Sequence, residues 1–211
     1  MSGSSSIKVR TIVDLLASRF GVIPWWSGDT DEVMIGAILT QQTRWENVER
    51  AICRLKEVNL LTLAEIHRAD PAVLEDAVRC TGFFRIKTRR LKALAALVIN
   101  TYGSVERMAE VPTGELRASL LSVKGIGEET ADSILCYGFS RTCFVVDAYT
   151  DRILRCAGIH VTPTEIRDLF ETALPVDPVI FRQTHAHIVE YAKTVCQKKR
   201  CDECQIASLN G

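Results

Sequence analysis

The sequence predicts an all-α protein. Apolar residues recur at helical spacing along most of its 211 residues, and glycine, proline and capping residues separate the apolar stretches. No alternation of strands and helices is present. The length allows one large domain or two small ones with a well-buried core.

The expected elements follow from this pattern in order. A short polar tail, 1–6, precedes a helix over 7–20, and Pro24 and Gly28 then break the pattern before a helix cap at Asp29 or Thr30. Asp70 followed by proline marks another helix start. Further helices are expected at 32–43, 45–58, 62–69, 70–80, 85–103, 114–123, 128–138, 148–158, 162–174 and 181–196, with a short extended run at 143–147.

Composition and charge restrict the class of protein. The formal net charge is +0, so no global positive field indicates a nucleic-acid partner, although local groups can still bind phosphate. The N-terminus lacks the apolar core of a signal peptide, and no run approaches the roughly 20 apolar residues of a membrane span. We therefore expect a soluble intracellular protein without membrane contact, cytoplasmic or, in a eukaryote, nuclear.

The eight cysteines fall into two groups. Five are scattered and are expected to be small buried hydrophobes in a reducing compartment: Cys53, Cys80, Cys136, Cys143 and Cys156. The other three, Cys196, Cys201 and Cys204, follow a C-x4-C-x2-C spacing close to the C-terminus.

A glycine turn, Val123-Lys124-Gly125-Ile126-Gly127, joins two expected helices. Glycine permits positive φ and close approach of the backbone to a ligand. The amides of such a turn and of the next helix start can hold a phosphate oxygen. Glu128 and Glu129 suit the start of a helix, and a plain helix–helix turn would also explain the pattern.

Asp147 stands twenty residues after Gly127, between the extended run and a helix. With three further stretches in the same order, GAILTQQTRWENVERAI, CTGFFRIKTRRLKALA and YAKTVCQKKRCDEC, the chain resembles the endonuclease III-like helix-hairpin-helix DNA glycosylases. The resemblance implies two helical domains, with the hairpin and the catalytic aspartate at the cleft between them. Residues 29–139 would form a six-helix barrel with the hairpin, and 1–28 plus 140–211 a second domain with the aspartate and the cysteine loop.

The resemblance also implies the chemistry. Asp147 would activate water or stabilise an oxocarbenium-like sugar, although it could also be only a helix N-cap. Glu129 stands where bifunctional endonuclease III has the lysine that forms a Schiff base, and a carboxylate cannot form an imine. We therefore expect a monofunctional base-excision-repair glycosylase without AP-lyase activity, acting as a monomer on double-stranded DNA that contains a damaged base.

The base pocket is expected to contain Trp25, Trp26, Trp45 and Glu129. Stacking on an aromatic ring returns about 1–3 kcal/mol per base, and a cationic alkylpurine gains further from a π-face. Trp25 and Trp26 could instead form a hydrophobic plug. The resemblance to the 3-methyladenine glycosylases of this fold indicates that substrate. DNA contacts are expected from Gln41 and Gln42, which would fill the gap left by the flipped base, and from Val123, Lys124, Gly125, Ile126, Gly127 and Thr130, with Arg85, Lys87, Arg89 and Arg90 as further phosphate contacts.

The cysteine loop resembles the [4Fe–4S] loop of endonuclease III, C-x6-C-x2-C-x5-C, but Asn210 stands at the position of the fourth ligand. A cluster with three cysteines, a zinc ion completed by His185 or His187, and no metal all remain open. Two other functions also remain open: a uracil, mismatch or oxidised-pyrimidine glycosylase of the same fold, and a non-catalytic helix-hairpin-helix DNA-binding protein.

Overall fold

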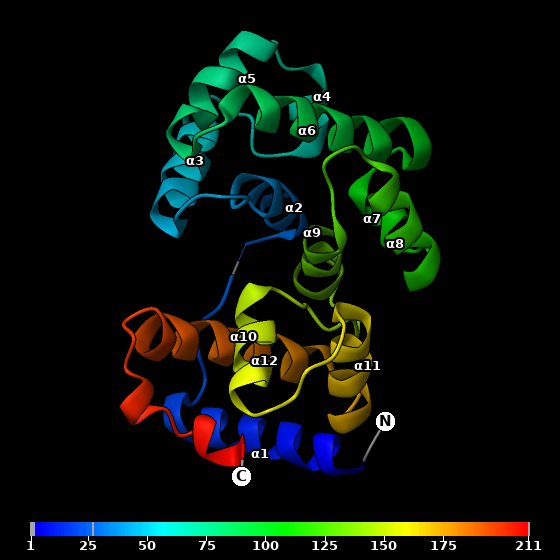
Figure 1. Cartoon of the computed structure of the whole chain (residues 1–211). Coiled ribbons are helices and arrows are strands. Elements are labelled where there is room, and N and C mark those ends of the chain that lie inside the picture. The colour runs from blue at the N-terminus through cyan, green and yellow to red at the C-terminus, as the bar shows by residue number, and fades with distance from the viewer. Residues whose placement is uncertain (1–2, 27, 211) are drawn as a thin grey trace. The chain divides into compact units, whose positions relative to one another are not determined.

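The fold is all-α, as predicted. A computed structural model describes residues 3–26 and 28–210, and this part of the chain contains helices and no strand. The chain divides into two compact helical units (Figure 1), one formed by Met1–Ser27 with Ser140–Gly211 and the other by Gly28–Phe139. We call them the terminal unit and the middle unit and describe each by itself.

The middle unit is built around α2 (Thr30–Leu39), in which every residue from Val33 to Leu39 is buried. A helix that is apolar on all sides belongs inside a domain, and α2 contacts α3, α6, α9 and η3. Asp29 caps its start by accepting a hydrogen bond from the Glu32 amide at 2.9 Å. The other elements are α3 (Trp45–Glu57), α4 (Leu63–Arg68), α5 (Pro71–Val78), η1 (Arg79–Thr81), α6 (Phe84–Leu97), η2 (Val98–Tyr102), α7 (Val105–Met108), α8 (Thr113–Ser122), α9 (Glu128–Ser133) and η3 (Ile134–Gly138).

The terminal unit joins the first helix to the C-terminal third of the chain. In Figure 1, α1 (Gly3–Phe20) runs beside segments that follow residue 140, and it packs on α11 (Pro163–Ala173) and α12 (Pro178–Tyr191). Lys8 Nζ donates to the Ala157 carbonyl at 3.1 Å, which ties α1 to the end of α10 (Ala148–Cys156). The remaining elements are η4 (Ala192–Cys196), η5 (Cys201–Glu203) and η6 (Ala207–Asn210).

Several helix boundaries differ from the sequence prediction; the helix expected at 32–43, for example, is α2, which ends at Leu39. The first helix begins at Gly3, so the polar tail expected at 1–6 is helical over its described part, because packing of the following turns on α11 and α12 supports the extension. The helix expected at 181–196 begins at Pro178, where Asp177 is the cap. The helix expected at 85–103 is α6 followed by the π-helical turn η2.

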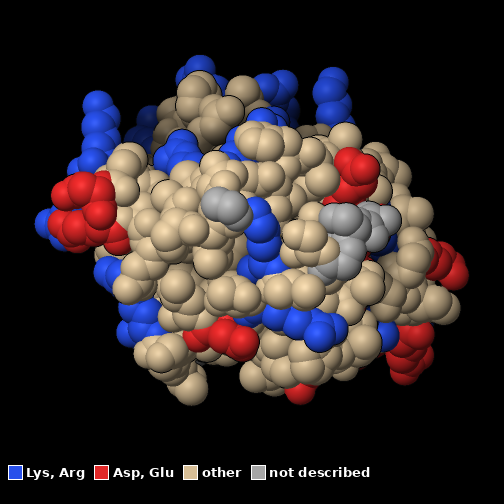
Figure 2. All heavy atoms as spheres, turned by 60° about the horizontal axis from the view of Figure 1, so that its bottom comes forward, with Lys and Arg blue, Asp and Glu red and all other residues tan. Residues whose placement is uncertain are grey.

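The surface agrees with the balanced composition. The face drawn in Figure 2 carries basic and acidic side chains scattered over largely uncharged surface, with no continuous basic field. Within residues 3–26 and 28–210, no helix combines the length and the hydropathy that crossing a bilayer requires.

Candidate active site

The predicted helix-hairpin-helix consists of α8, the turn 123–127 and α9, and its two glycines have different roles. Gly125 has φ +96°, and a Cβ there would lie 2.2 Å from Arg90 Nε, so both backbone and packing require glycine. Gly127 has an ordinary φ of −94°, and a Cβ there would meet open space. A side chain would therefore fit at Gly127, and its open side leaves room for a ligand.

The hairpin amides are not equally available. The amides of Val123 and Ile126 donate within the turn, to Leu120 O at 3.1 Å and to Val123 O at 3.0 Å, and both side chains are buried. Among the described residues, the N–H groups of Gly125 and Gly127 have no acceptor in the chain. Of the predicted hairpin contacts, these two amides and the exposed Lys124 are the groups that can reach a phosphate.

Gln41 holds the hairpin to the end of α2. Its Nε2 donates to Gly125 O and to Thr130 Oγ1, each at 3.1 Å, and its Oε1 accepts a hydrogen bond from Arg90. Gln42, by contrast, is exposed and has a left-handed φ of 54°. Of the two glutamines, Gln42 is therefore the more exposed, and its predicted contact with DNA stays a prediction.

A pocket of about 430 Å³ lies beside the hairpin in the middle unit. Its walls include the predicted residues Gln41, Gln42, Glu129 and Thr130, and also Phe83, Lys87 and Arg90. Trp45, at the start of α3, does not line it and is 39% exposed. Phe83, which the sequence analysis did not assign, is 63% exposed and has φ 46° directly after Gly82, a combination visible only in the structure.

Lys87 was predicted to contact phosphate, and this prediction is wrong, because its side chain is only 1% exposed. Its Nζ donates to the carbonyl oxygens of Leu39 at 2.7 Å and Thr81 at 2.8 Å, joining α2, η1 and α6. Burial, and secondarily the charge of Arg90, lower the pKa of Lys87 to about 8.

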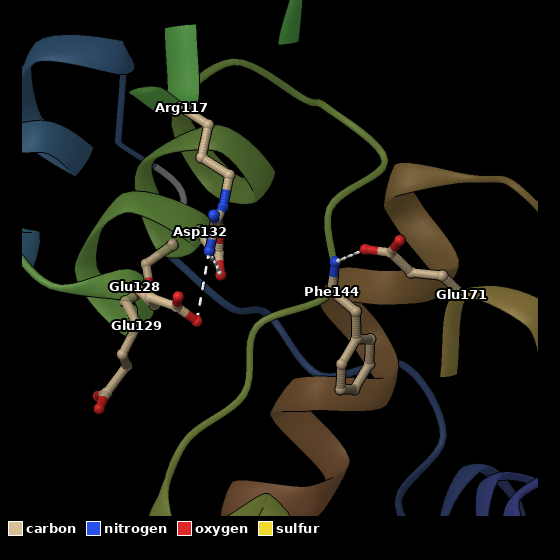
Figure 3. A network of polar contacts seen from close by, with 7 residues as sticks. Arg117, Glu128, Glu129, Asp132, Phe144 and Glu171 are labelled. Carbon is tan, nitrogen blue, oxygen red and sulfur yellow. Dashed lines mark hydrogen bonds and ion pairs between the residues drawn. The ribbon is translucent and has the colours of Figure 1, made fainter. Parts of the chain in front are cut away.

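The two consecutive glutamates at the start of α9 separate in space (Figure 3). Arg117 of α8 pairs with the buried Asp132 at 2.7 Å and with Glu128 at 3.5 Å, which holds the two hairpin helices together. Glu129 is directed away from this cluster and lines the pocket. Glu128 therefore has a structural role, whereas Glu129 is positioned to influence what enters the pocket.

In the terminal unit, Asp147 is the N-cap of α10, as the sequence allowed. Its Oδ1 accepts hydrogen bonds from the Thr150 amide at 2.8 Å and the Thr150 hydroxyl at 2.9 Å. Its Oδ2 lies 3.4 Å from His185 Nε2. Burial raises the pKa of Asp147, but the charge of His185 and the hydrogen bonds from His185 and Thr150 outweigh it, so the pKa lies below its ordinary value.

His185 therefore belongs to the environment of Asp147, a role the sequence analysis did not assign. Trp25 meets its ring edge-on at 6.5 Å, and Lys193 Nζ lies 5.5 Å from the centroid of the Trp25 ring. Trp25 and Trp26 are both half-buried, and Trp26 has a left-handed φ of 36°. The structure thus brings Trp25 to the neighbourhood of Asp147.

The family model that describes the "HhH-GPD superfamily base excision DNA repair protein" matches residues 35–175, which include both the hairpin and Asp147. The chain belongs to this superfamily. It is 44% identical over 205 residues to MJ1434 of Methanocaldococcus jannaschii, provisionally named a DNA repair glycosylase, covering 94% of this chain and 93% of that one. It is also 31% identical to endonuclease III of Thermotoga maritima, covering 83% of this chain and 80% of the relative.

Among solved structures, the HhH-GPD chain is similar to the 3-methyladenine DNA glycosylase MagIII of H. pylori, bound to 1,N6-ethenoadenine. The TM-score is 0.79 at 27% identity, with 90% of this chain and 97% of that one covered. These comparisons confirm the predicted superfamily and its general activity, base-excision DNA glycosylase. They leave the base and the reaction type to be proposed.

Proposed function

We propose that this HhH-GPD protein is a monofunctional glycosylase that releases 3-methyladenine from double-stranded DNA and acts as a monomer. The observation that carries the proposal is Glu129, a carboxylate lining the pocket of the middle unit at the position of the Schiff-base lysine of bifunctional endonuclease III. The similarity to the H. pylori 3-methyladenine glycosylase supports the choice of base.

The chemistry assigned to Asp147 is hydrolysis. A water oxygen forms the new bond to the anomeric carbon while the N-glycosidic bond breaks, and the carboxylate takes the proton of the water. A positively charged methylated purine leaves with the bonding electrons as a neutral base, so it needs no acid. The lowered pKa of Asp147 keeps it in the anionic form that also stabilises an oxocarbenium-like sugar.

A base that stacks on Trp25 shares this ring with Lys193, whose ammonium lies 5.5 Å from the ring centroid. The cationic base would then stack on the face of the ring opposite Lys193. Replacement of Trp25 by alanine should reduce release of 3-methyladenine more than binding to undamaged DNA.

The decisive experiment combines base release and borohydride trapping on a panel of single-lesion duplexes. We expect release of 3-methyladenine, poor action on uracil and thymine glycol, and no trapped adduct. Asp147→Asn keeps a good N-cap and should lose at least about 10²-fold in rate. A Glu129→Lys variant is the matched control, because it places an amine at the pocket and should yield a trapped adduct.

Substantial trapping by the wild-type protein would overturn the monofunctional assignment and would favour a bifunctional enzyme like the endonuclease III relative. Lys87, the lysine that lines the pocket, would then be the first nucleophile to test, through Lys87→Met. Preference for thymine glycol or uracil would refute the substrate, and an undiminished rate in Asp147→Asn would remove Asp147 from the mechanism. DNA binding without any base release would indicate a non-catalytic protein.

A further inference from the structure

The segment 21–26 follows α1 and contains neither helix nor strand. The Gly21 amide donates to the last turn of α1 at 2.9 Å, and within the described part of the chain 22–25 make no hydrogen bond between main-chain groups. Val22 is 87% exposed, so packing of its side chain does not fix the segment either. Side chains from elsewhere in the terminal unit must therefore determine where Trp25 is placed.

Gln183 of α12 binds both main-chain groups of Ile23. Its Oε1 accepts a hydrogen bond from the Ile23 amide at 2.9 Å, and its Nε2 donates to the Ile23 carbonyl oxygen at 2.8 Å. The pairing resembles that between two antiparallel strands, with a side-chain amide in place of the second main chain. A carboxylate can only accept and an ammonium can only donate, so this contact requires an amide side chain.

Pro24 transmits the position of Ile23 to Trp25. Proline fixes its own φ at about −65° and restricts the residue before it to extended conformations. Ile23 and Trp25 are two residues apart, so a stiff link of at most about 7 Å joins them. The place of the indole therefore depends on where Gln183 holds the main chain.

His187 holds the start of the same segment. It stands one turn after Gln183 on α12, and its Nε2 lies 2.6 Å from the Gly21 carbonyl oxygen. His185 and His187, both considered from the sequence as zinc ligands, thus have other partners, because His185 pairs with Asp147 at 3.4 Å. Within residues 3–26 and 28–210, no group of three or more His, Cys, Asp or Glu side chains could hold a metal ion.

Trp25 is the residue of this segment that reaches the surroundings of Asp147. Its indole meets the His185 ring edge-on, with the centroids 6.5 Å apart, and Lys193 Nζ lies 5.5 Å from the indole centroid. His185 Nε2 in turn lies 3.4 Å from Asp147 Oδ2. A displacement of the indole would therefore change both the surface on which a base can stack and the surroundings of the carboxylate.

We propose that Gln183 is a positioning residue for base release: by binding both main-chain groups of Ile23, it holds the indole of Trp25 where the flipped base stacks. The proposal rests on the proposed function, in which Trp25 contacts the base. Ile23 is half-buried, so water can replace both hydrogen bonds and the loss of Gln183 should cost little stability. Misplacing a substrate-binding group by about 1 Å can nevertheless lower a rate about 10²-fold.

The test is a double-mutant cycle on the single-turnover rate of base release by the full chain, on the lesion that the wild type processes fastest. Gln183→Met loses both hydrogen bonds and should be about 10- to 100-fold slower, with unchanged affinity for undamaged DNA. Gln183→Glu, which has nearly the same shape, cannot donate to the Ile23 carbonyl oxygen when ionised and should also be slower. Added to Trp25→Ala, Gln183→Met should have no further effect, because it acts through the indole.

Fluorescence reports the position of Trp25 without DNA or activity. In a protein that keeps Trp25 as its only tryptophan, through Trp26→Phe and Trp45→Phe, Gln183→Met should increase quenching by acrylamide and lower the anisotropy of the indole emission. Lys8→Met is the matched control. It also removes a side-chain hydrogen bond to a main-chain carbonyl oxygen of the terminal unit, but about 18 Å along α1 from the end of that helix. It should change neither the fluorescence nor the rate.

The role of Gln183 and the proposed function fail in different ways. A wild-type rate in Gln183→Met beside a slow Trp25→Ala would refute the role of Gln183 and leave the aromatic slot intact. Effects of the two changes that multiply, or an unchanged Trp25 fluorescence in Gln183→Met, would also refute that role. Full activity of Trp25→Ala, or no base release by the wild type, would refute the aromatic slot or the glycosylase itself, and the positioning role with it.

Discussion

Replacing His185 by glutamine tests whether the charge beside Asp147 keeps that carboxylate ionised. His185 Nε2 lies 3.4 Å from Asp147 Oδ2, and the two side chains are only 8% and 10% exposed. Glutamine retains a hydrogen-bond donor of similar reach but cannot carry a charge. The variant therefore removes mainly the electrostatic part of the contact.

The magnitude follows from Coulomb's law. At 3.4 Å and an effective dielectric constant of about 20, two unit charges interact by about 5 kcal/mol. Losing even about 1.4 kcal/mol of this displaces the protonation equilibrium of Asp147 tenfold. Burial, the largest influence, raises the pKa of Asp147, and in the variant hydrogen bonds alone oppose it, without the charge of His185. The pKa must therefore rise in the variant, and the ionised fraction at a given pH must fall.

The assay is the single-turnover rate of 3-methyladenine release from about pH 5 to about pH 9, because the acid limb of such a profile reports the catalytic carboxylate. We expect His185→Gln to have its acid limb at higher pH than the wild type, so that the variant is slowed most at the acid end of this range and approaches the wild-type rate as the pH rises.

His187→Gln is the matched control. His187 is also buried on α12, but it stacks on Phe20 at 6.2 Å and contacts the Gly21 carbonyl oxygen, not Asp147. It should change stability and leave the acid limb in place. A wild-type rate and an unmoved acid limb in His185→Gln would refute the electrostatic role of His185.

Three further experiments separate stability from DNA binding. Gly125→Ala should lower the free energy of thermal unfolding by at least about 1–2 kcal/mol, because of the positive φ at this position and the clash with Arg90. Gly127→Ala should leave the unfolding free energy unchanged and weaken DNA binding. Equal melting temperatures of the two variants would contradict this. Between pH 8 and pH 10.5 the unfolded chain still binds a proton that folded Lys87 has released, so the free energy of unfolding of the wild type should rise by up to about 3 kcal/mol. In denaturant titrations Lys87→Met should lose this rise, whereas the control Lys92→Met should keep it. The logarithm of DNA affinity should fall with the logarithm of salt concentration with a slope of about −3, reduced by about 1 in Lys124→Ala; a slope near −10 would reveal a basic surface that has been missed.

The fold was predictable because its signals are local. The apolar pattern of α2, the Asp29 cap and the Asp70-Pro71 start each act within a few residues, and the structure confirms all three. The errors lie where tertiary contacts decide: packing on α11 and α12 extends α1 into a serine-rich tail that has only moderate helix propensity.

The sequence predicts only those parts of the candidate site that belong to a motif. The hairpin and the position of Asp147 follow from the sequence, but the partners of each residue do not. Gln41 and Gln42 are neighbours in sequence, yet one is hydrogen-bonded to Gly125 and Thr130 and the other is exposed. Lys87 lies in a basic stretch with exposed arginines, and only its hydrogen bonds to two carbonyl oxygens show that it is a buried structural residue of the middle unit.

The rim of the middle-unit pocket combines two features that reduce stability and that packing within the unit does not explain. Gln42 and Phe83 are non-glycine residues with left-handed φ values of 54° and 46°, a conformation that costs roughly 1–2 kcal/mol per residue. Phe83 in addition exposes 63% of an aromatic surface. Strained backbone and exposed aromatic surface persist where a ligand makes use of them. Because both residues line the pocket that also contains Glu129, we expect them to contact DNA in the proposed function. A role limited to helix packing would favour glycine at these backbone angles and a smaller polar side chain in place of the phenyl ring.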